Sequence, residues 1–300
     1  MASEEMQAVV AVLRARMVDR DDDVTDFVAR RADMEQWTST APVPDGMEVE
    51  PVSAGGVPAE WVSMPGCDPS RVVQYHHGGA YTAGSLNTHR RFVALLAEAT
   101  GARVLSVDYR LAPEHPHPAA VDDAVAAYRW LTSTAGIAPE HVVIAGDSAG
   151  GGLSAAMLVA LRDAGDPMPA GGALISPWTD LTLEGASHDT RYDVDPMCNR
   201  DTLRPSVLVY ANGLSPRTPL VSPLHADLTG LPPLVIHVGD HETLLDDSVG
   251  LAESAAKAGV DVDLWVAPEM VHVWHAFTGL VPESEVALQK LAAWIRTRLR

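Results

Sequence analysis

The sequence predicts an α/β fold built on a mainly parallel sheet. From about residue 100 onward, apolar strand-like runs alternate with helix-like runs roughly every 30 residues, which is the spacing of β-α-β units. One of these runs, residues 141–145, breaks directly into the small-residue stretch 146–152, as a buried strand does when it turns into a helix. Hydrophobic residues make up 47% of the 300 residues, which is enough for the large core that such a sheet requires.

The first 45 residues show helical periodicity. Apolar residues recur at helical spacing in residues 6–13 and again in 24–28, on either side of the charged run 20–23. We therefore expect two amphipathic helices. We assign them, as residues 1–45, to a cap that lies on the remainder of the chain, residues 46–300.

The pattern changes to strand-like alternation after residue 46. Two alternating runs, 47–51 and 57–62, flank Gly55 and Gly56 and predict a β-hairpin, and a third strand follows at 71–76. The later strands are expected at 103–107, 142–145, 172–175, 234–238 and 262–266, and the helices at 89–99, 119–131, 150–162, 246–258 and 283–299.

Residues 187–223 interrupt the alternation of strands and helices. Prolines recur along this segment, around the apolar stretch 203–210. A structureless loop of this length is uncommon in a compact domain, so we predict an insertion with its own helix that joins the cap.

The chain is strongly acidic, with a formal net charge of −19 at pH 7. Nucleic acids and anionic membrane surfaces attract basic proteins, so neither is an expected partner, and a small ligand without strong negative charge is favoured. Cys67 and Cys198 are too few for a disulfide framework, which favours a reducing compartment. The first residues do not resemble a signal peptide and no apolar run reaches membrane-spanning length, so we expect a soluble cytoplasmic protein.

Ser148 stands at the break between the buried strand and the helix start. Gly146 and Gly150 flank it in the pattern G-x-S-x-G, which lets a serine sit exposed on a strained turn while the amide of Ala149 opens the helix. An exposed hydroxyl beside free backbone N–H groups is what nucleophilic attack on a carbonyl requires. Alternatively, Ser148 only caps the helix in an ordinary glycine-rich turn.

A second glycine pair follows the strand at 71–76. Gly78 and Gly79 let the backbone approach a substrate oxygen with N–H groups forward, so we predict an oxyanion hole made of these two amides and that of Ala149. Taken alone, the pair also fits a plain turn before the next helix. We expect His77 to hold this loop in shape rather than to transfer protons.

The segment between the two glycine motifs carries a specific resemblance. Residues 108–120, together with 77–79 and 146–151, resemble the hormone-sensitive-lipase-like family of α/β-hydrolases, in particular its bacterial carboxylesterases. The resemblance extends over roughly residues 70–280 through the segments 176–181 and 231–234 and the region around His272.

This resemblance implies an α/β-hydrolase fold with an eight-stranded, mostly parallel sheet flanked by helices. The first strands are then antiparallel, and a helical cap covers the site. Family members often pair through the last strand, here 262–266, so a homodimer is expected. The segment 110–118 is structural in the family, and we expect no catalytic role for it.

An α/β-hydrolase carries its catalytic residues in the order serine, acid, histidine. The acid is therefore expected after the strand at 234–238. Glu242 is the residue whose spacing to Leu244 and Asp246 matches the family pattern acid-x-Leu-x-Asp. Aspartate is commoner than glutamate at this place, and Asp240 remains the alternative.

Position also selects the candidate base among 12 histidines. His272 follows the last core strand, where the fold delivers the catalytic histidine. His275 is the competitor, and we expect it to pack or to cap a helix.

Together these residues predict a serine carboxylesterase that acts on small uncharged esters of short to medium acyl chains through an acyl-enzyme. No cofactor or metal is expected, because the chain has neither a phosphate-binding G-x-x-x-x-G-K-[ST] motif nor metal-ligand spacing. Lactonase or amidase chemistry at the same site is an alternative. A non-catalytic receptor on this fold, such as the plant gibberellin receptors, lacks the triad histidine, and related peptidases usually carry an extra large domain.

We expect the two cap segments to close an apolar pocket above the site. An apolar pocket gains about 0.8 kcal/mol per buried methylene until it is full, so activity should rise to butyryl or hexanoyl esters and fall beyond about C8. The candidate lining residues are Met34, Trp37, Met197, Leu203, Val207 and Leu208.

Overall fold

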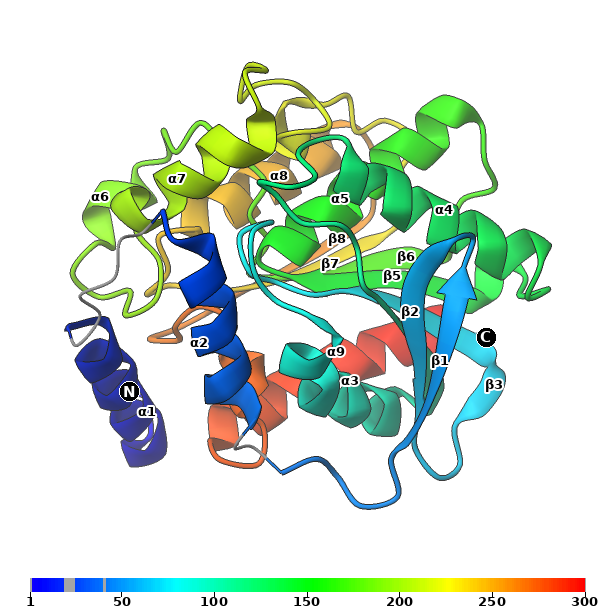
Figure 1. Cartoon of the computed structure of the whole chain (residues 1–300), viewed down its shortest axis with the longest axis horizontal. Coiled ribbons are helices and arrows are strands. Elements are labelled where there is room, and N and C mark those ends of the chain that lie inside the picture. Colours follow the sequence, from blue (N-terminus) through cyan, green and yellow to red (C-terminus); the bar gives the residue numbers. More distant parts are fainter. Residues whose placement is uncertain (1, 19–24, 40–41, 300) are drawn as a thin grey trace.

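The computed structural model describes residues 2–18, 25–39 and 42–299, and its centre is an eight-stranded sheet (Figure 1). The strand order is β1-β2-β4-β3-β5-β6-β7-β8, with β1 and β2 antiparallel to their neighbours and β3 to β8 mutually parallel. This confirms the predicted sheet. The strands are β1 (Glu48–Ala54), β2 (Val57–Ser63), β3 (Asp68–His76), β4 (Ala102–Val107), β5 (Val142–Asp147), β6 (Gly171–Ile175), β7 (Leu234–Gly239) and β8 (Val262–Ala267).

The hairpin between β1 and β2 shows why two glycines are needed there. Ala54 pairs with Val57, which leaves a two-residue loop. Gly55 and Gly56 have φ values of 66° and 94°, the left-handed conformations that this kind of hairpin loop requires. A side chain on Gly55 would also place its Cβ 2.7 Å from the Ala126 carbonyl oxygen.

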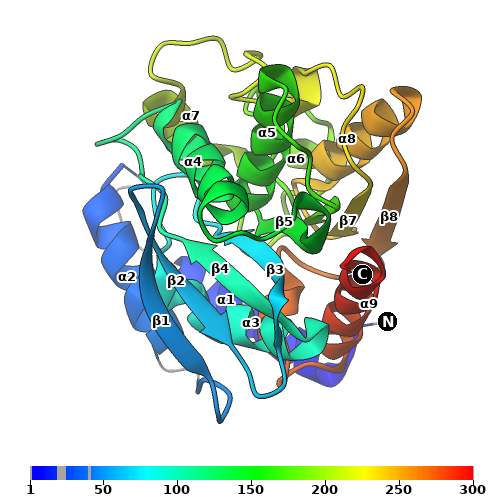
Figure 2. The same cartoon turned by 90° about the vertical axis from the view of Figure 1, so that its right-hand side faces the viewer.

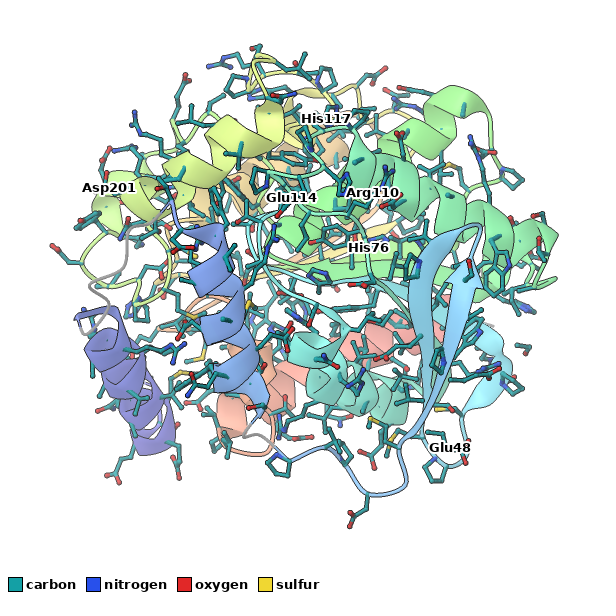
Figure 3. All side chains as sticks on the ribbon, in the orientation of Figure 1. Glu48, His76, Arg110, Glu114, His117 and Asp201 are labelled. Atoms are coloured by element: carbon teal, nitrogen blue, oxygen red, sulfur yellow. The ribbon has the colours of Figure 1, made fainter. Side chains whose placement is uncertain are left out.

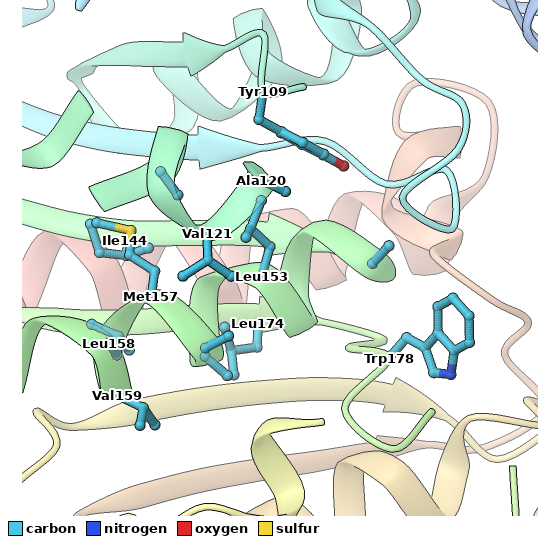
Figure 4. Close-up of a cluster of buried hydrophobic side chains, with 14 of the residues drawn as sticks. Tyr109, Ala120, Val121, Ile144, Leu153, Met157, Leu158, Val159, Leu174 and Trp178 are labelled. Atoms are coloured by element: carbon cyan, nitrogen blue, oxygen red, sulfur yellow. The ribbon is translucent and has the colours of Figure 1, made fainter. Parts of the chain in front are cut away.

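Helices cover both faces of the sheet (Figures 1 and 2). α3 (Leu86–Thr100) and α9 (Pro282–Arg298) pack on one face, and α4 (Ala119–Ser133), α5 (Ala149–Ala164) and α8 (Leu245–Lys257) pack on the other. β5, β6 and β7 are consequently buried along their whole length, which explains their continuous apolar sequences. Figure 4 shows part of the cluster that holds α4 and α5 on the sheet and so fixes where β5 ends.

The two predicted N-terminal helices are present as α1 (Glu4–Val18) and α2 (Phe27–Ser39), while residues 20–24 lie outside the described residues. α1 is anchored by apolar contacts, because Met6 and Leu13 are buried in a cluster with the loop that follows β8. α2 has no buried residue. Its attachment to the core therefore depends on polar side chains.

The predicted insertion contains α6 (Ser187–Thr190) and α7 (Arg200–Ala211). Asn199 caps α7 by accepting hydrogen bonds from two backbone N–H groups of its first turn. Leu203 and Val207 face inward and are buried, whereas Leu208 is 68% exposed. Leu208 is therefore wrong as a pocket-lining residue, because the helical turn places it on the outer side of α7.

Candidate active site

Ser148 occupies a sharp turn between β5 and α5. Its φ and ψ are 53° and −122°, a conformation that a serine rarely adopts and that marks local strain. The flanking glycines are required sterically: a Cβ on Gly146 would lie 2.3 Å from the Gly150 carbonyl oxygen, and one on Gly150 would lie 2.0 Å from that of His76. The Ser148 side chain makes no helix-capping hydrogen bond, so the alternative of a simple capping serine does not hold.

The three predicted catalytic side chains come together from three separate loops. His272 Nε2 lies 2.9 Å from Ser148 Oγ, and His272 Nδ1 lies 2.9 Å from Glu242 Oε2. Glu242 follows β7 and His272 follows β8, so the parallel strands deliver both residues to the edge of the sheet where Ser148 lies. All three residues are buried, with Glu242 fully inaccessible.

The two competing residues lie elsewhere. Asp240 Oδ1 accepts a hydrogen bond from the Glu269 backbone N–H at 2.5 Å, and no hydrogen bond joins it to His272. His275 Nε2 lies 2.9 Å from Nδ1 of the buried His237, on the side of the loop away from Ser148. The geometry therefore places Glu242, and neither competitor, in the hydrogen-bonded chain.

Ser176 is a buried residue of the site that the sequence analysis quoted but gave no role. Its hydroxyl donates to Glu242 Oε1 at 2.7 Å and accepts from the Val273 backbone N–H at 3.1 Å. The Gly239 N–H also donates to Glu242 Oε1, at 2.6 Å. Ser176 thus connects the loop that carries the acid to the loop that carries His272.

Burial and charge act on this chain in opposite directions. Burial raises the pKa of Glu242, and hydrogen bonds from His272 and its other neighbours oppose that rise. Burial by itself lowers the pKa of His272, but the adjacent Cys198 and Glu242 outweigh it and raise that pKa well above its ordinary value. Because burial also raises the pKa of the Cys198 thiol, that group is uncharged near neutral pH, and Glu242 is the anion that stabilises a protonated His272. The sequence gave no signal that Cys198 would lie beside His272.

The glycine loop after β3 differs in one respect from the prediction. The Gly78 N–H donates to Asp147 Oδ1 at 3.0 Å, so this amide is not free to hold an oxyanion. Gly78 must be glycine for that approach, since a Cβ would lie 2.3 Å from Asp147 Oδ2. Among the described residues, no hydrogen-bond acceptor is found for the N–H groups of Gly79, Ala80 and Ala149. The prediction of Gly78 as a donor is wrong by one residue position, because the direction of each amide depends on the folded turn.

Asp147 joins the nucleophile turn to this loop. Besides the Gly78 N–H, it accepts a hydrogen bond from the Tyr75 hydroxyl at 2.5 Å, and its Oδ2 lies 3.5 Å from His89 Nε2. Burial tends to raise the pKa of Asp147, but His89 and Tyr75 outweigh that effect and lower it, so the carboxylate is ionised. The turn and the loop are therefore held together by a buried anion.

His77 fits its predicted role in shaping the loop. Its Nδ1 lies 2.8 Å from the Gly78 carbonyl oxygen, and its ring stacks on Tyr109 with the centroids 4.3 Å apart. Burial lowers the pKa of His77 to about 3. A histidine that stays neutral in this way is suited to structural packing.

Neither a metal centre nor a membrane anchor is found in the part of the chain that the structure describes. No group of three or more histidine, cysteine or acidic side chains there is arranged to hold a metal ion. The described helices likewise include none with the length and apolar character needed to cross a membrane.

Comparison with known proteins places this geometry in a family. A sequence profile described as the α/β hydrolase fold matches residues 73–276. The chain belongs to the α/β-hydrolase family. An acetyl-hydrolase from Streptomyces hygroscopicus is 44% identical over 297 residues, which cover 99% of this α/β-hydrolase and 98% of the relative. Carboxylesterase NlhH from Mycobacterium tuberculosis is 40% identical over 236 residues, which cover 76% of this chain and 74% of the relative.

Solved structures give the same assignment. A crystal structure of an esterase from the bacterial hormone-sensitive lipase family is 43% identical, with a TM-score of 0.96 and full coverage, 100%, of both chains. The esterase EstE5, in a crystal soaked with p-nitrophenyl butyrate, is 44% identical, with a TM-score of 0.95 and 99% of both chains covered. The resemblance to the hormone-sensitive-lipase-like family is thereby confirmed.

Proposed function

We propose that this α/β-hydrolase is a serine carboxylesterase for small uncharged esters, in which Ser148 is the nucleophile, His272 the general base and Glu242 the acid. The observation that carries the proposal is the hydrogen-bonded chain of these three side chains, with 2.9 Å at each contact. The esterases and the acetyl-hydrolase among its relatives support the same activity.

The reaction begins when the Ser148 oxygen attacks the acyl carbon and its proton passes to His272 Nε2. Glu242 stabilises the resulting imidazolium through Nδ1–H. His272 then protonates the leaving alcohol, which gives an acyl-enzyme. Water, activated by the same histidine, attacks the acyl group and releases the acid and free Ser148.

The free N–H groups of Gly79, Ala80 and Ala149 are suited to hold the negative oxygen formed in both steps. Each such donor contributes about 100- to 1000-fold in kcat in serine hydrolases, because it is already oriented before charge develops. Ala80 replaces Gly78 in this proposal, since the Gly78 N–H is bound to Asp147.

We infer that the N-terminal helices and the insertion 187–223 form the cap over this site, on the catalytic domain 46–300. Met34, Met197, Leu203 and Val207, which are buried or partly buried, remain the candidates for the apolar pocket wall. A closed pocket of this kind favours butyryl or hexanoyl esters over those longer than about C8.

The test compares the wild type with Ser148→Ala on p-nitrophenyl esters of increasing acyl length. Ser148→Ala should lower kcat by about 1000-fold or more, since triad members act as a unit. Ser133→Ala, at an exposed serine of α4, is the matched control and should leave the rate unchanged. Near wild-type turnover in folded Ser148→Ala would refute the proposed function, and a maximum at C16 in the wild type would refute the closed pocket.

A further inference from the structure

We propose that Arg31, on α2, is a positioning residue for the oxyanion loop, so that α2 controls the rate of the chemical step and does not only cover the pocket. The inference rests on the proposed esterase function. It concerns an N-terminal helix that lies far from the catalytic residues in sequence but against their loop in space (Figure 1).

The Arg31 guanidinium binds backbone carbonyls of two loops. Its Nε donates to the Thr82 carbonyl oxygen at 2.7 Å, and its Nη2 donates to that of Ala112 at 2.8 Å. Ala112 in turn donates its N–H to the Tyr81 carbonyl oxygen at 2.9 Å. One side chain therefore connects the end of the oxyanion loop to the segment that packs beside it.

Thr82 closes the turn that sets the oxyanion donors. The N–H groups of Thr82 and Ala83 both donate to the Gly79 carbonyl oxygen, at 3.1 and 2.9 Å. Within this turn Gly79, Ala80 and Tyr81 have positive φ values of 121°, 54° and 62°. Positive φ at two successive residues other than glycine is strained, and such strain persists only where surrounding contacts hold it. Arg31 supplies one of these contacts at the point where the turn ends.

Glu114 orients the guanidinium. Its Oε1 and Oε2 accept hydrogen bonds from Arg31 Nη1 and Nη2 at 2.9 and 2.7 Å, and the Arg31 hydrogen bonds lower the pKa of Glu114 to about 2. Figure 3 labels Glu114 in the loop beside α2. Glu114 is 51% exposed, so the ion pair itself adds little stability, and its effect is to fix the plane of the fork.

A second polar contact of α2 reaches the same loop. Glu35 accepts a hydrogen bond from the Ser85 hydroxyl, and Ser85 is the N-cap of α3, which follows the oxyanion loop directly. Because α2 has no buried residue, these contacts and not an apolar interface attach it here. Loss of Arg31 should therefore loosen the loop without unfolding the core.

The test measures kcat and KM separately for Arg31→Gln and Arg31→Lys on p-nitrophenyl butyrate. Both variants should lower kcat by about 10- to 100-fold with little change in KM, since a displaced donor weakens the transition state more than substrate binding. Lysine should not rescue, because one ammonium group cannot reach two carbonyl oxygens and a carboxylate in the guanidinium geometry.

The matched control is Arg14→Gln on α1. Arg14 Nη2 also donates to two carbonyl oxygens, those of Asp193 and Val194, but these lie in the insertion and not in the oxyanion loop. Its kcat should stay within about twofold of the wild type, as is usual for an exposed side chain away from the site. An equal loss in both variants would overturn the assignment to the oxyanion loop.

Chemical rescue separates positioning from a general loss of structure. Guanidinium chloride at a few millimolar should restore part of kcat in Arg31→Ala, whereas sodium chloride and urea at the same concentration should not. Unchanged kcat in folded Arg31→Gln, a rise in KM alone, or full activity in Arg31→Lys would each refute the proposal. A wild type without esterase activity would instead refute the proposed function, so the two failures are distinguishable.

Discussion

The insertion and α2 both attach to the α/β core by polar contacts, but they hold different halves of the site. In the insertion, Ser187 Oγ donates to the Thr243 carbonyl oxygen at 2.6 Å and Arg191 Nε donates to that of Asp240 at 2.6 Å, on either side of Glu242. Arg31 of α2 contacts the oxyanion loop instead. The comparison indicates that one cap segment supports the acid and the histidine, while the other supports the oxyanion donors.

The two sets of contacts also differ in burial. Asp195 in the insertion is 7% exposed and accepts hydrogen bonds from the backbone N–H groups of Thr243, Met197 and Cys198. The Arg31 side chain is 28% exposed and its partner Glu114 is 51% exposed. Breaking the buried contacts leaves donors without water, whereas water can replace the exposed ones. Changes in the insertion should therefore affect both stability and rate, and changes in α2 mainly the rate.

Asp195→Ala should have the largest effect. Three buried N–H groups lose their acceptor, at about 1 to 3 kcal/mol for each that stays unpaired, so the free energy of unfolding should fall by about 3 kcal/mol. Displacement of the Glu242 loop should lower kcat by about 100-fold. Urea denaturation and steady-state kinetics measure the two losses, and Asp193→Ala, at an exposed neighbour, is the control. Wild-type stability in Asp195→Ala would contradict the buried side of the comparison.

The pH profile should separate the two halves of the site. His272 must be neutral to accept the Ser148 proton, and its pKa is raised, so kcat/KM should increase with pH through a midpoint above the ordinary histidine pKa. Asp195→Ala should lower that midpoint by loosening the Glu242 contact, whereas Arg31→Gln should lower the plateau, by the 10- to 100-fold given above, without moving the midpoint. A shift of the midpoint in Arg31→Gln would merge the two halves.

The same raised pKa has the opposite effect on stability. A group whose pKa is higher in the folded than in the unfolded state stabilises the fold below its unfolded pKa, and this contribution is lost as pH rises through the folded pKa. His272 should therefore contribute most to stability at acidic pH, where the enzyme is least active.

The smallest effect is expected at α1. Ser3 donates from its N–H and its hydroxyl to the Glu283 carboxylate, at 2.6 and 2.8 Å, which connects the start of α1 to α9. Glu283→Ala should lower the free energy of unfolding by about 1 kcal/mol or less and leave kcat unchanged, because this partly exposed contact touches neither half of the site. Thermal unfolding with kinetics at 25 °C, about room temperature, measures both, and a loss of kcat would show that α1 also supports the site.

The sequence by itself determined the residues whose role depends on local pattern. Gly146 and Gly150 identified the turn of Ser148, because the chain there passes so close to itself that only glycine fits. Alternation of strands and helices identified the parallel sheet. The order of the loops then selected Glu242 and His272, because parallel strands bring their carboxyl ends to one edge.

Only the tertiary structure decided which groups satisfy which partners. Gly78 and Ala80 have the same kind of amide, and the folded turn alone determines that Asp147 binds the first and leaves the second free. Leu208 falls outside the pocket because the phase of α7 is set by what the helix packs on. Ser176, Asp195 and Arg31 act on loops 66, 48 and 51 residues away in sequence. Such contacts leave no local pattern, because their direction and distance are fixed only when separate loops pack together.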